Sequence, residues 1–105
     1  IRPALYEGYH EIWPVKQHEG DTIVADIVGP ICESGDFQAQ NREIADVKPG
    51  EVLAEMSAGA YGFSMASTYN SRPLAAEVLV DGNKWHIIRR RQTLEQIVEG
   101  ECLPE

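Results

Sequence analysis

The chain has 105 residues, of which 43% are hydrophobic and 25% charged, a composition that fits one globular domain with a single modest core. Its formal net charge of -8 would repel a phosphate backbone, so the charge balance argues against nucleic acid as a partner. The apolar runs are too short to cross a bilayer, which argues against a membrane protein.

The first residues, Ile1-Arg2-Pro3, contain neither an initiating methionine nor the apolar core of a signal peptide. We therefore expect a segment cut from a longer protein that works in the reducing cytoplasm, with Cys32 and Cys102 unpaired. The histidines are scattered, and neither a CxxC nor an HxxxH spacing occurs. The sequence therefore gives little support to a structural metal site.

Short strands dominate the predicted secondary structure of the first half. Alternating large apolar and polar residues predict a strand over residues 9–15, and β-branched residues predict another over residues 22–28, before Gly29-Pro30 ends it. Residues 46–50, which end in Pro-Gly, predict a turn, because proline presets φ and glycine accepts a positive φ. We expect a third strand over residues 51–56.

The clearest hairpin lies in the second half. Residues 75–80 and 84–89 are rich in Val, Ile and Trp, and they flank Asp81-Gly82-Asn83. A strand pair that is separated by Asp-Gly is typical of a β-hairpin with a tight turn.

Helices are a minority element. One is predicted over residues 58–69, and a shorter one over residues 93–99, where Thr93 and Gln96 form a capping box. Several short strands without regular β-α alternation predict a mainly β fold class. We expect an antiparallel sheet or a partly closed, Greek-key-like β-barrel with short flanking helices.

The first candidate functional segment is residues 29–36, which follow a strand and place Cys32 next to Glu33. A thiol at a strand end can deliver a proton to a carbanion, and an adjacent carboxylate can hold a substrate ammonium. The alternative is a buried cysteine in a turn, because free cysteine packs as a small apolar residue in most proteins. The local pattern leaves both interpretations open.

Two further segments could bind a ligand. Small residues surround Tyr61 in residues 57–64, so the phenol could donate to a phosphate, although the same composition can mark close packing of two elements. In residues 2–6, Arg2 could grip a carboxylate in two places while Tyr6 adds a hydrogen bond. The alternative for Arg2 is a solvated terminal charge.

In combination and in order, these motifs resemble the diaminopimelate decarboxylase family, and the resemblance covers nearly the whole chain. The matching stretches are residues 2–6 with Tyr9-His10, then residues 29–36, 59–65, 69–73 and 77–80. The Cys-Glu-Ser-Gly-Asp loop and the Gly-Ala-Tyr segment are shared in outline with the wider fold-type III decarboxylases, which act on ornithine and arginine. The Arg-Pro-x-Leu-Tyr stretch narrows the choice.

The resemblance implies an enzyme of two domains. An N-terminal TIM-like barrel would bind pyridoxal 5′-phosphate through a lysine, and residues 1–105 would form the single C-terminal β-domain. None of Lys16, Lys48 and Lys84 lies in a motif that matches the cofactor lysine. The chain alone is therefore expected to be inactive.

The resemblance also implies a homodimer whose active site is shared across the interface. The loop with Cys32 and Glu33 would reach into the barrel of the partner subunit. Arg2, Tyr6 and Glu33 match substrate-binding positions, and Tyr61 matches a tyrosine that contacts both cofactor and substrate. We expect Cys32 to be the acid that protonates the carbanion after carbon dioxide leaves.

Charge argues for diaminopimelate as the small-molecule substrate, because its distal end carries both a carboxylate and an ammonium. Arg2 could bind the former and Glu33 the latter, whereas an ornithine decarboxylase faces only a distal amine and gains nothing from the arginine. The expected product is lysine, since the cofactor stores the electrons that carbon dioxide leaves behind. The alternatives are another fold-type III decarboxylase, for arginine or a carboxylated polyamine, and a non-catalytic β-domain that binds a small ligand.

Overall fold

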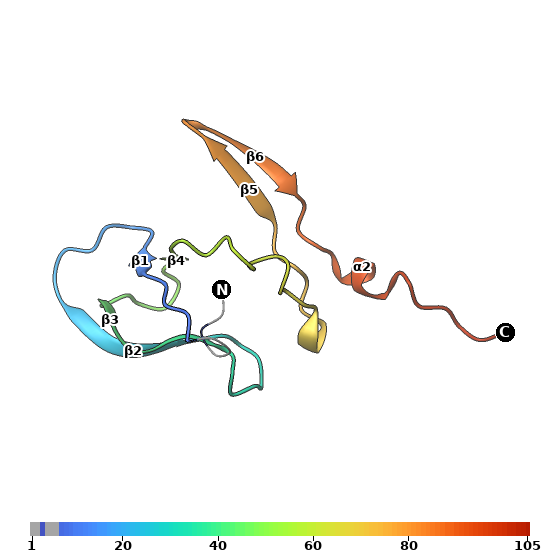
Figure 1. The fold of residues 1–105 in the computed structure, drawn as a ribbon, viewed down its shortest axis with the longest axis horizontal. Coiled ribbons are helices and arrows are strands. Elements are labelled where there is room, and N and C mark those ends of the chain that lie inside the picture. The colour runs from blue at the N-terminus through green and yellow to red at the C-terminus, as the bar shows by residue number, and fades with distance from the viewer. Residues whose placement is uncertain (1–2, 4–6) are drawn as a thin grey trace. The chain divides into compact units, whose positions relative to one another are not determined.

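The structure, a computed structural model, describes Pro3 and residues 7–105 (Figure 1). The chain divides into two compact units, Ile1–Met65 and Ala66–Glu105. The elements of the described residues are β1 (Ile12–Pro14), β2 (Thr22–Val28), β3 (Phe37–Ala45), β4 (Leu53–Glu55), the 3-10 helix η1 (Tyr69–Ser71), β5 (Glu77–Asp81), β6 (Lys84–Arg89) and α2 (Leu94–Val98). The described strands pair two by two in antiparallel sheets, which confirms the mainly β, antiparallel prediction.

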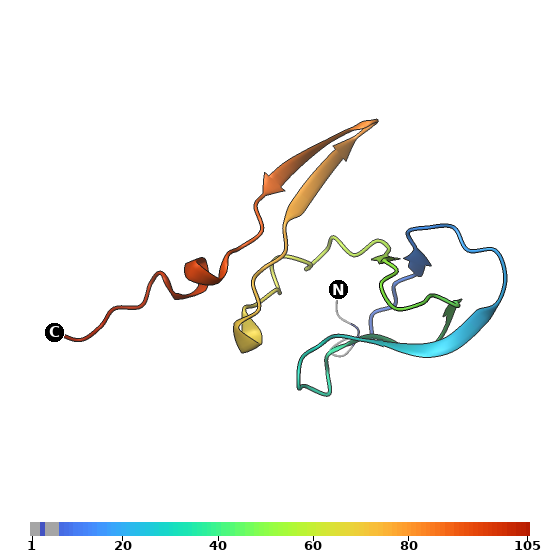
Figure 2. The same cartoon turned by 180° about the vertical axis from the view of Figure 1, so that it is seen from behind.

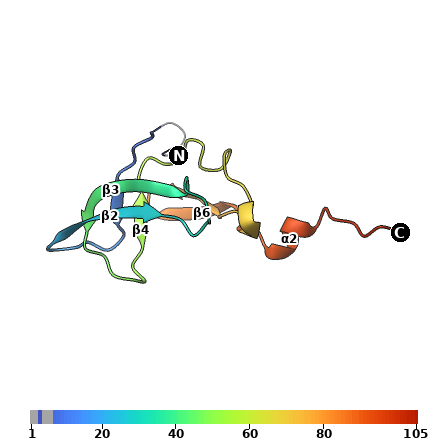
Figure 3. The same cartoon turned by 90° about the horizontal axis from the view of Figure 1, so that it is seen from below.

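The β2–β3 hairpin of the first unit carries an irregular register. Strand β2 has the predicted bounds, whereas β3 was not predicted. Gln40 and Asn41 both lie opposite Asp26, which makes a β-bulge. Asn41 has a φ of 49°, and its N–H donates to Asp26 Oδ1 at 2.8 Å. A second register shift follows at the end of β2, so the hairpin is irregular next to its loop. Figure 3 shows strands β2 and β3 side by side.

The β1–β4 pair forms the other sheet of the first unit. Both strands were predicted, but they are shorter than expected because regular pairing covers only three residues of each. Strand β1 also contacts β3. Buried apolar side chains come from these two strands: among the described residues they are Ile12, Ala39 and Ile44. The core of the first unit is therefore small.

The predicted turn before β4 is confirmed. The Glu51 N–H donates to the Lys48 carbonyl oxygen at 3.1 Å, with Pro49 and Gly50 between them. Gly50 has a φ of 94°. A proline followed by a residue with positive φ is typical of a type II turn.

The β5–β6 hairpin of the second unit is confirmed, with Val80 opposite Trp85 and a turn at Gly82, whose φ is 62° (Figure 2). The predicted C-terminal helix is also confirmed as α2. Thr93 is its N-cap, and the Thr93 and Gln96 side chains each accept a hydrogen bond from the other residue's N–H, at 3.2 and 2.9 Å. This reciprocal capping box stabilises a helix that is otherwise very short.

The predicted helix over residues 58–69 is wrong. The segment forms turns, and the only helical geometry nearby is η1 at its end. Tyr61 has a φ of 65°, which no α-helix can accommodate. Gly59 and Gly62 also disfavour a helix, because glycine loses more conformational freedom than alanine in a helix interior. In the part of the chain that the structure describes, no helix is long and apolar enough to cross a membrane.

Candidate active-site loop

Asp36 closes the loop of residues 29–36, which joins β2 to β3 and is drawn in teal in Figure 1. The Gly29 N–H donates to the Asp36 carbonyl oxygen at 2.9 Å, and the Ile31 N–H donates to Asp36 Oδ2 at 2.8 Å. The Asp36 N–H in turn donates to the Glu33 carbonyl oxygen at 3.0 Å. One residue thus binds the loop backbone at three points.

The Asp36 carboxylate occupies the space that a side chain at Gly29 would fill. A Cβ atom built on Gly29 would overlap with the Asp36 carboxylate. The φ of Gly29 lies outside the left-handed region, so its backbone is open to any residue. Glycine is therefore required at this position for space, and not for its conformational freedom.

Cys32 lies at the centre of a three-residue turn. The Glu33 N–H donates to the Ile31 carbonyl oxygen at 2.8 Å, which is the hydrogen bond of a γ-turn. The thiol of Cys32 is free and exposed. The sequence left open whether Cys32 is buried in a turn. In this chain it is not buried, and its thiol is accessible to a reactant.

Glu33 is the exposed neighbour of Cys32. One of its carboxylate oxygens, Oε1, accepts the Gly35 N–H at 3.1 Å. A carboxylate offers about four acceptor positions, so this bond leaves capacity for further donors. The structure thus places an exposed thiol and an exposed carboxyl group side by side on one loop.

Tyr61 lies on a separate turn of the same unit. The Gly62 N–H donates to Gly59 O at 3.2 Å, and the Met65 N–H donates to Tyr61 O at 3.1 Å. The side chain is 49% exposed, and its positive φ is rare for an aromatic residue. Sparsely populated backbone conformations of this kind concentrate at functional sites.

The remaining predicted site residues, Arg2 and Tyr6, lie outside the described residues. The residues that follow them are held by Arg42 of β3, a residue that the sequence analysis missed. Arg42 Nη1 donates to the His10 carbonyl oxygen at 2.6 Å, and the guanidinium carbon lies 3.9 Å from the centroid of the Tyr9 ring. Arg42 thereby holds Tyr9 and His10 next to the hairpin that carries Cys32.

A polar pocket of about 340 Å³ adjoins this contact. Its lining includes Pro3, Glu7, Phe37, Gln40 and Arg42. Both signs of charge are present, from Glu7 and from the Arg42 guanidinium.

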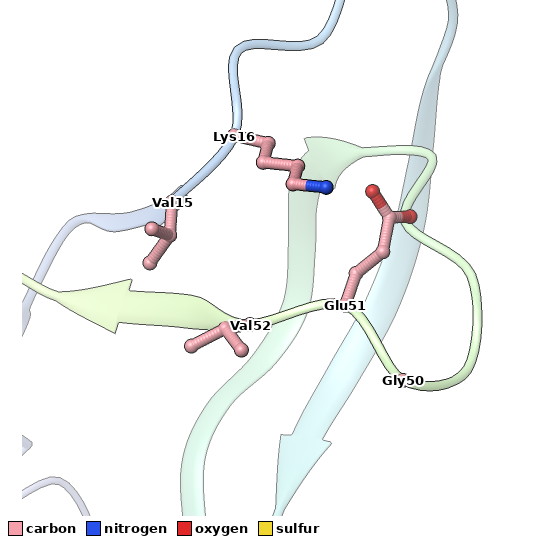
Figure 4. A pocket seen from close by; sticks show the side chains of 5 residues that line it. All are labelled: Val15, Lys16, Gly50, Glu51 and Val52. Atoms are coloured by element: carbon pink, nitrogen blue, oxygen red, sulfur yellow. The ribbon is translucent and has the colours of Figure 1, made fainter.

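Figure 4 shows a second pocket, of about 190 Å³, beside the end of the β1–β4 pair, and its described lining contains none of the predicted site residues. Its lining consists of Val15, Lys16, Gly50, Glu51 and Val52. The Lys16 ammonium points toward the Glu51 carboxylate, and Val15 and Val52 form the apolar side.

Glu51 is held by two neighbours of this pocket. The Lys48 N–H donates to Glu51 Oε2, and His18 Nε2 donates to Glu51 Oε1 at 2.7 Å. These contacts lower the pKa of Glu51 from its ordinary value, the Lys48 hydrogen bond most strongly and the His18 hydrogen bond next. The Glu51 carboxylate therefore stays ionised to a lower pH than an ordinary glutamate does.

The described residues contain no group of three His, Cys, Asp or Glu side chains that could hold a metal ion. Cys102, like Cys32, is a free and exposed thiol.

Residues 1–59, more than half of the chain, match the family described as "Pyridoxal-dependent decarboxylase, C-terminal sheet domain". The chain belongs to the pyridoxal-dependent decarboxylases. Among curated relatives, the diaminopimelate decarboxylase of Aquifex aeolicus is 58% identical over 99 residues, which cover 94% of this chain and 24% of the relative. That of Neisseria meningitidis serogroup B is 56% identical over 105 residues, with 98% and 25% covered.

Solved structures of these decarboxylases share the fold. The diaminopimelate decarboxylase from M. jannaschii is 39% identical, with a TM-score of 0.91 over 98% of this chain and 24% of that chain. Another structure of that enzyme is a complex with L-lysine. A protein from Aquifex aeolicus is 57% identical, with a TM-score of 0.90 over 93% of this chain and 24% of that chain. The chain thus spans about a quarter of the length of the relatives it matches, and the resemblance seen in its motifs is confirmed.

Proposed function

We propose that the chain, residues 1–105, is the C-terminal domain of a diaminopimelate decarboxylase, which converts meso-2,6-diaminopimelate to L-lysine and carbon dioxide. The similarity to enzymes of that name carries the proposal, because relatives at 56–58% identity cover 94–98% of the chain. The exposed Cys32 and Glu33 on one loop supply the chemistry that the reaction needs. Cys32 has to stay a free thiol for this role, so the proposal includes a reducing, cytoplasmic setting.

The described residues fit one side of a pyridoxal-phosphate site. Tyr61 is 49% exposed on a turn of small residues, which let a phosphate or a ring oxygen approach the backbone closely. Lys48 is paired with Asp46 at 2.9 Å. None of Lys16, Lys48 and Lys84 lies in a motif that matches the cofactor lysine, so we assign the lysine that holds the cofactor to a barrel domain outside this chain. When bound, pyridoxal phosphate supplies the electron sink that stabilises the charge left by carbon dioxide.

The residues of this chain bind the substrate and move one proton. In the proposal, Glu33 binds the ammonium of the distal end of the substrate, and Arg2 binds its carboxylate with help from Tyr6. Tyr61 orients the reacting end through its hydroxyl. Cys32 holds its proton close to the carbon that loses carbon dioxide and delivers it there, which yields L-lysine.

The active site of the proposed enzyme is shared by two subunits. The exposed γ-turn at Cys32 supports this arrangement, because a short turn that projects its thiol suits insertion into a neighbouring site. We place the Cys32 loop of one subunit in the barrel of its partner. A homodimer would then hold two such composite sites.

Subunit mixing tests the proposal in the complete protein. Cys32→Ala should lower kcat for diaminopimelate, because proton delivery is lost while substrate binding is kept. Mixing Cys32→Ala subunits with subunits that lack the cofactor lysine should restore activity, since one hybrid site regains both groups. Cys102→Ala removes the other exposed thiol and should leave activity unchanged.

Two outcomes would contradict the proposal. Normal turnover by Cys32→Ala, with lysine as the product, would remove the role of the thiol. Decarboxylation of arginine or a carboxylated polyamine in preference to diaminopimelate would favour the other fold-type III decarboxylases.

A further inference from the structure

We propose that Asp36 is a positioning residue that holds Cys32 in place for proton delivery, and that Gly29 provides the space its carboxylate needs. This inference rests on the proposed function, because it assigns a role in the same reaction. Asp36 would not touch the substrate, and it would act only through the loop backbone.

The hydrogen bonds around Cys32 carry the inference. The two residues that flank Cys32 are each bonded to Asp36: the Ile31 N–H to its carboxylate at 2.8 Å, and the Glu33 carbonyl to its N–H at 3.0 Å. Ile31 and Glu33 are also bonded to each other at 2.8 Å across Cys32. Cys32 therefore lies on a turn whose two ends are both hydrogen-bonded to Asp36.

The hydrogen bond from the Ile31 N–H to the Asp36 carboxylate is of a strong type. A hydrogen bond from a backbone N–H to an ionised carboxylate is roughly twice as strong as one between neutral groups. The second contact is steric, since any side chain at Gly29 would displace the Asp36 carboxylate from its position over the Gly29 Cα. Asp36 and Gly29 thus act as one unit.

Loss of the Asp36 contacts is expected to affect kcat and not KM. A displacement of a reacting group by about 1 Å can cost about 100-fold in rate. Cys32 acts after the substrate is bound, so its displacement should reduce kcat and leave KM almost unchanged. A residue that only stabilised the fold would lower the amount of active enzyme and would not change the conformation of the Cys32 turn.

The first experiment compares three variants of the complete enzyme. Asp36→Ala should lower kcat by about 10- to 100-fold with KM within about 3-fold of the original. Asp36→Asn retains an oxygen that can accept the Ile31 N–H, and it should recover kcat to within about 5-fold. Asp26→Ala is the matched control, because Asp26 also accepts a backbone N–H at 2.8 Å in the same hairpin but at the bulge.

Amide hydrogen exchange supplies a readout that does not depend on activity. In Asp36→Ala, the amides of Ile31 and Glu33 should exchange about 10-fold faster, while those of β2 and β3 keep their protection. In Asp26→Ala, the amides of Ile31 and Glu33 should exchange as in the original protein.

A double-mutant cycle tests the steric half of the inference. Gly29→Ala should reproduce the loss of kcat and the faster exchange, because its methyl group displaces the Asp36 carboxylate. In an Asp36→Ala background the same substitution should have almost no further effect, since no carboxylate remains to be displaced. Additive effects of the two substitutions would overturn the pairing of Gly29 with Asp36.

The remaining outcomes separate the inference from the proposed function. Unchanged exchange at Ile31 and Glu33 in Asp36→Ala, or equal losses in Asp26→Ala and Asp36→Ala, would overturn the positioning role. If the original complete protein did not decarboxylate diaminopimelate at all, the proposed function would fail. Amide exchange alone would then decide whether Asp36 holds the Cys32 turn in place.

Discussion

The pKa of Glu51 illustrates how a single residue couples stability to pH. Its carboxylate accepts the Lys48 N–H within the turn and also binds His18 from the segment after β1. Because the folded pKa lies below the ordinary value of 4.5, ionised Glu51 stabilises the folded chain above about pH 4.5. This contribution is lost as the pH falls through the folded pKa. Glu51 is an exposed residue, so solvent screening keeps the contribution small.

Substitution of His18 separates the two hydrogen bonds that lower the pKa of Glu51. His18→Ala should raise the pKa of Glu51 only in part, because the Lys48 N–H bond is the larger cause and remains. A carbon NMR titration of the Glu51 carboxyl group measures both values directly. As a control, Glu51→Gln should abolish the added stability above pH 4.5 without changing the turn. A Glu51 pKa at its ordinary value in the original chain would contradict this account.

At the scale of elements, the bulge in β3 gives the β2–β3 hairpin its irregular register. Asn41 adopts a left-handed conformation there, with its N–H bonded to Asp26. Asparagine tolerates this region better than other residues that carry a Cβ, because its short polar side chain can bond locally.

Replacement of Asn41 tests the conformational requirement. Asn41→Ala should destabilise the hairpin by about 1–2 kcal/mol, whereas Asn41→Gly should be close to neutral, because glycine enters the left-handed region freely. The control is Glu43→Ala, an exposed position in the regular part of β3, which should cost less than about 0.5 kcal/mol. Amide exchange of the hairpin measures all three. Equal destabilisation by alanine and glycine at position 41 would show that the side chain matters, and not the conformation.

The elements that depend on local chemistry were predicted well. The end of β2 follows from Gly29-Pro30, the type II turn from Pro49-Gly50, and the start of α2 from Thr93 with Gln96. Each of these features is fixed by residues that are close in sequence, so a pattern is enough to find it.

Strand β3 was missed. Strand β3 is rich in Gln, Asn, Arg and Glu, which have no strong preference for strands, and it forms because it pairs with β2. In the candidate site, too, some residues can be predicted from the local sequence and others cannot. Cys32 and Glu33 are recognisable from their loop, whereas the contact of Arg42 with His10 joins residues 32 positions apart and leaves no signal in the sequence.

At the scale of the whole molecule, the apolar surface of the β5–β6 hairpin is the dominant feature of the second unit. Val78, Val80, Trp85 and Ile87 are directly paired across the hairpin, so their side chains lie on the same face. All four are exposed, Val80 to 69% and Trp85 to 66%. Contiguous apolar patches of this kind mark surfaces that bind other protein.

We expect the isolated chain to self-associate through this face. Its weight-average mass in sedimentation velocity should rise with concentration, and Val80→Thr with Trp85→Thr should suppress the rise while keeping β-propensity. Val24→Thr removes an equally exposed valine, on β2, and should not suppress it. A chain that stays monomeric over the whole concentration range would contradict the expectation.

The position of the Asp36 carboxylate, where a Cβ atom on Gly29 would lie, also constrains the descent of this loop. A lineage that acquires a larger residue at position 29 loses the space for an aspartate at position 36, and the first change alone would impair the loop. Positions 29 and 36 are therefore expected to covary among homologous sequences, so that Gly-Asp is kept as a pair or exchanged as a pair. Mixed combinations should be rare intermediates that selection removes, although the two positions are seven residues apart and neither side chain need meet the substrate.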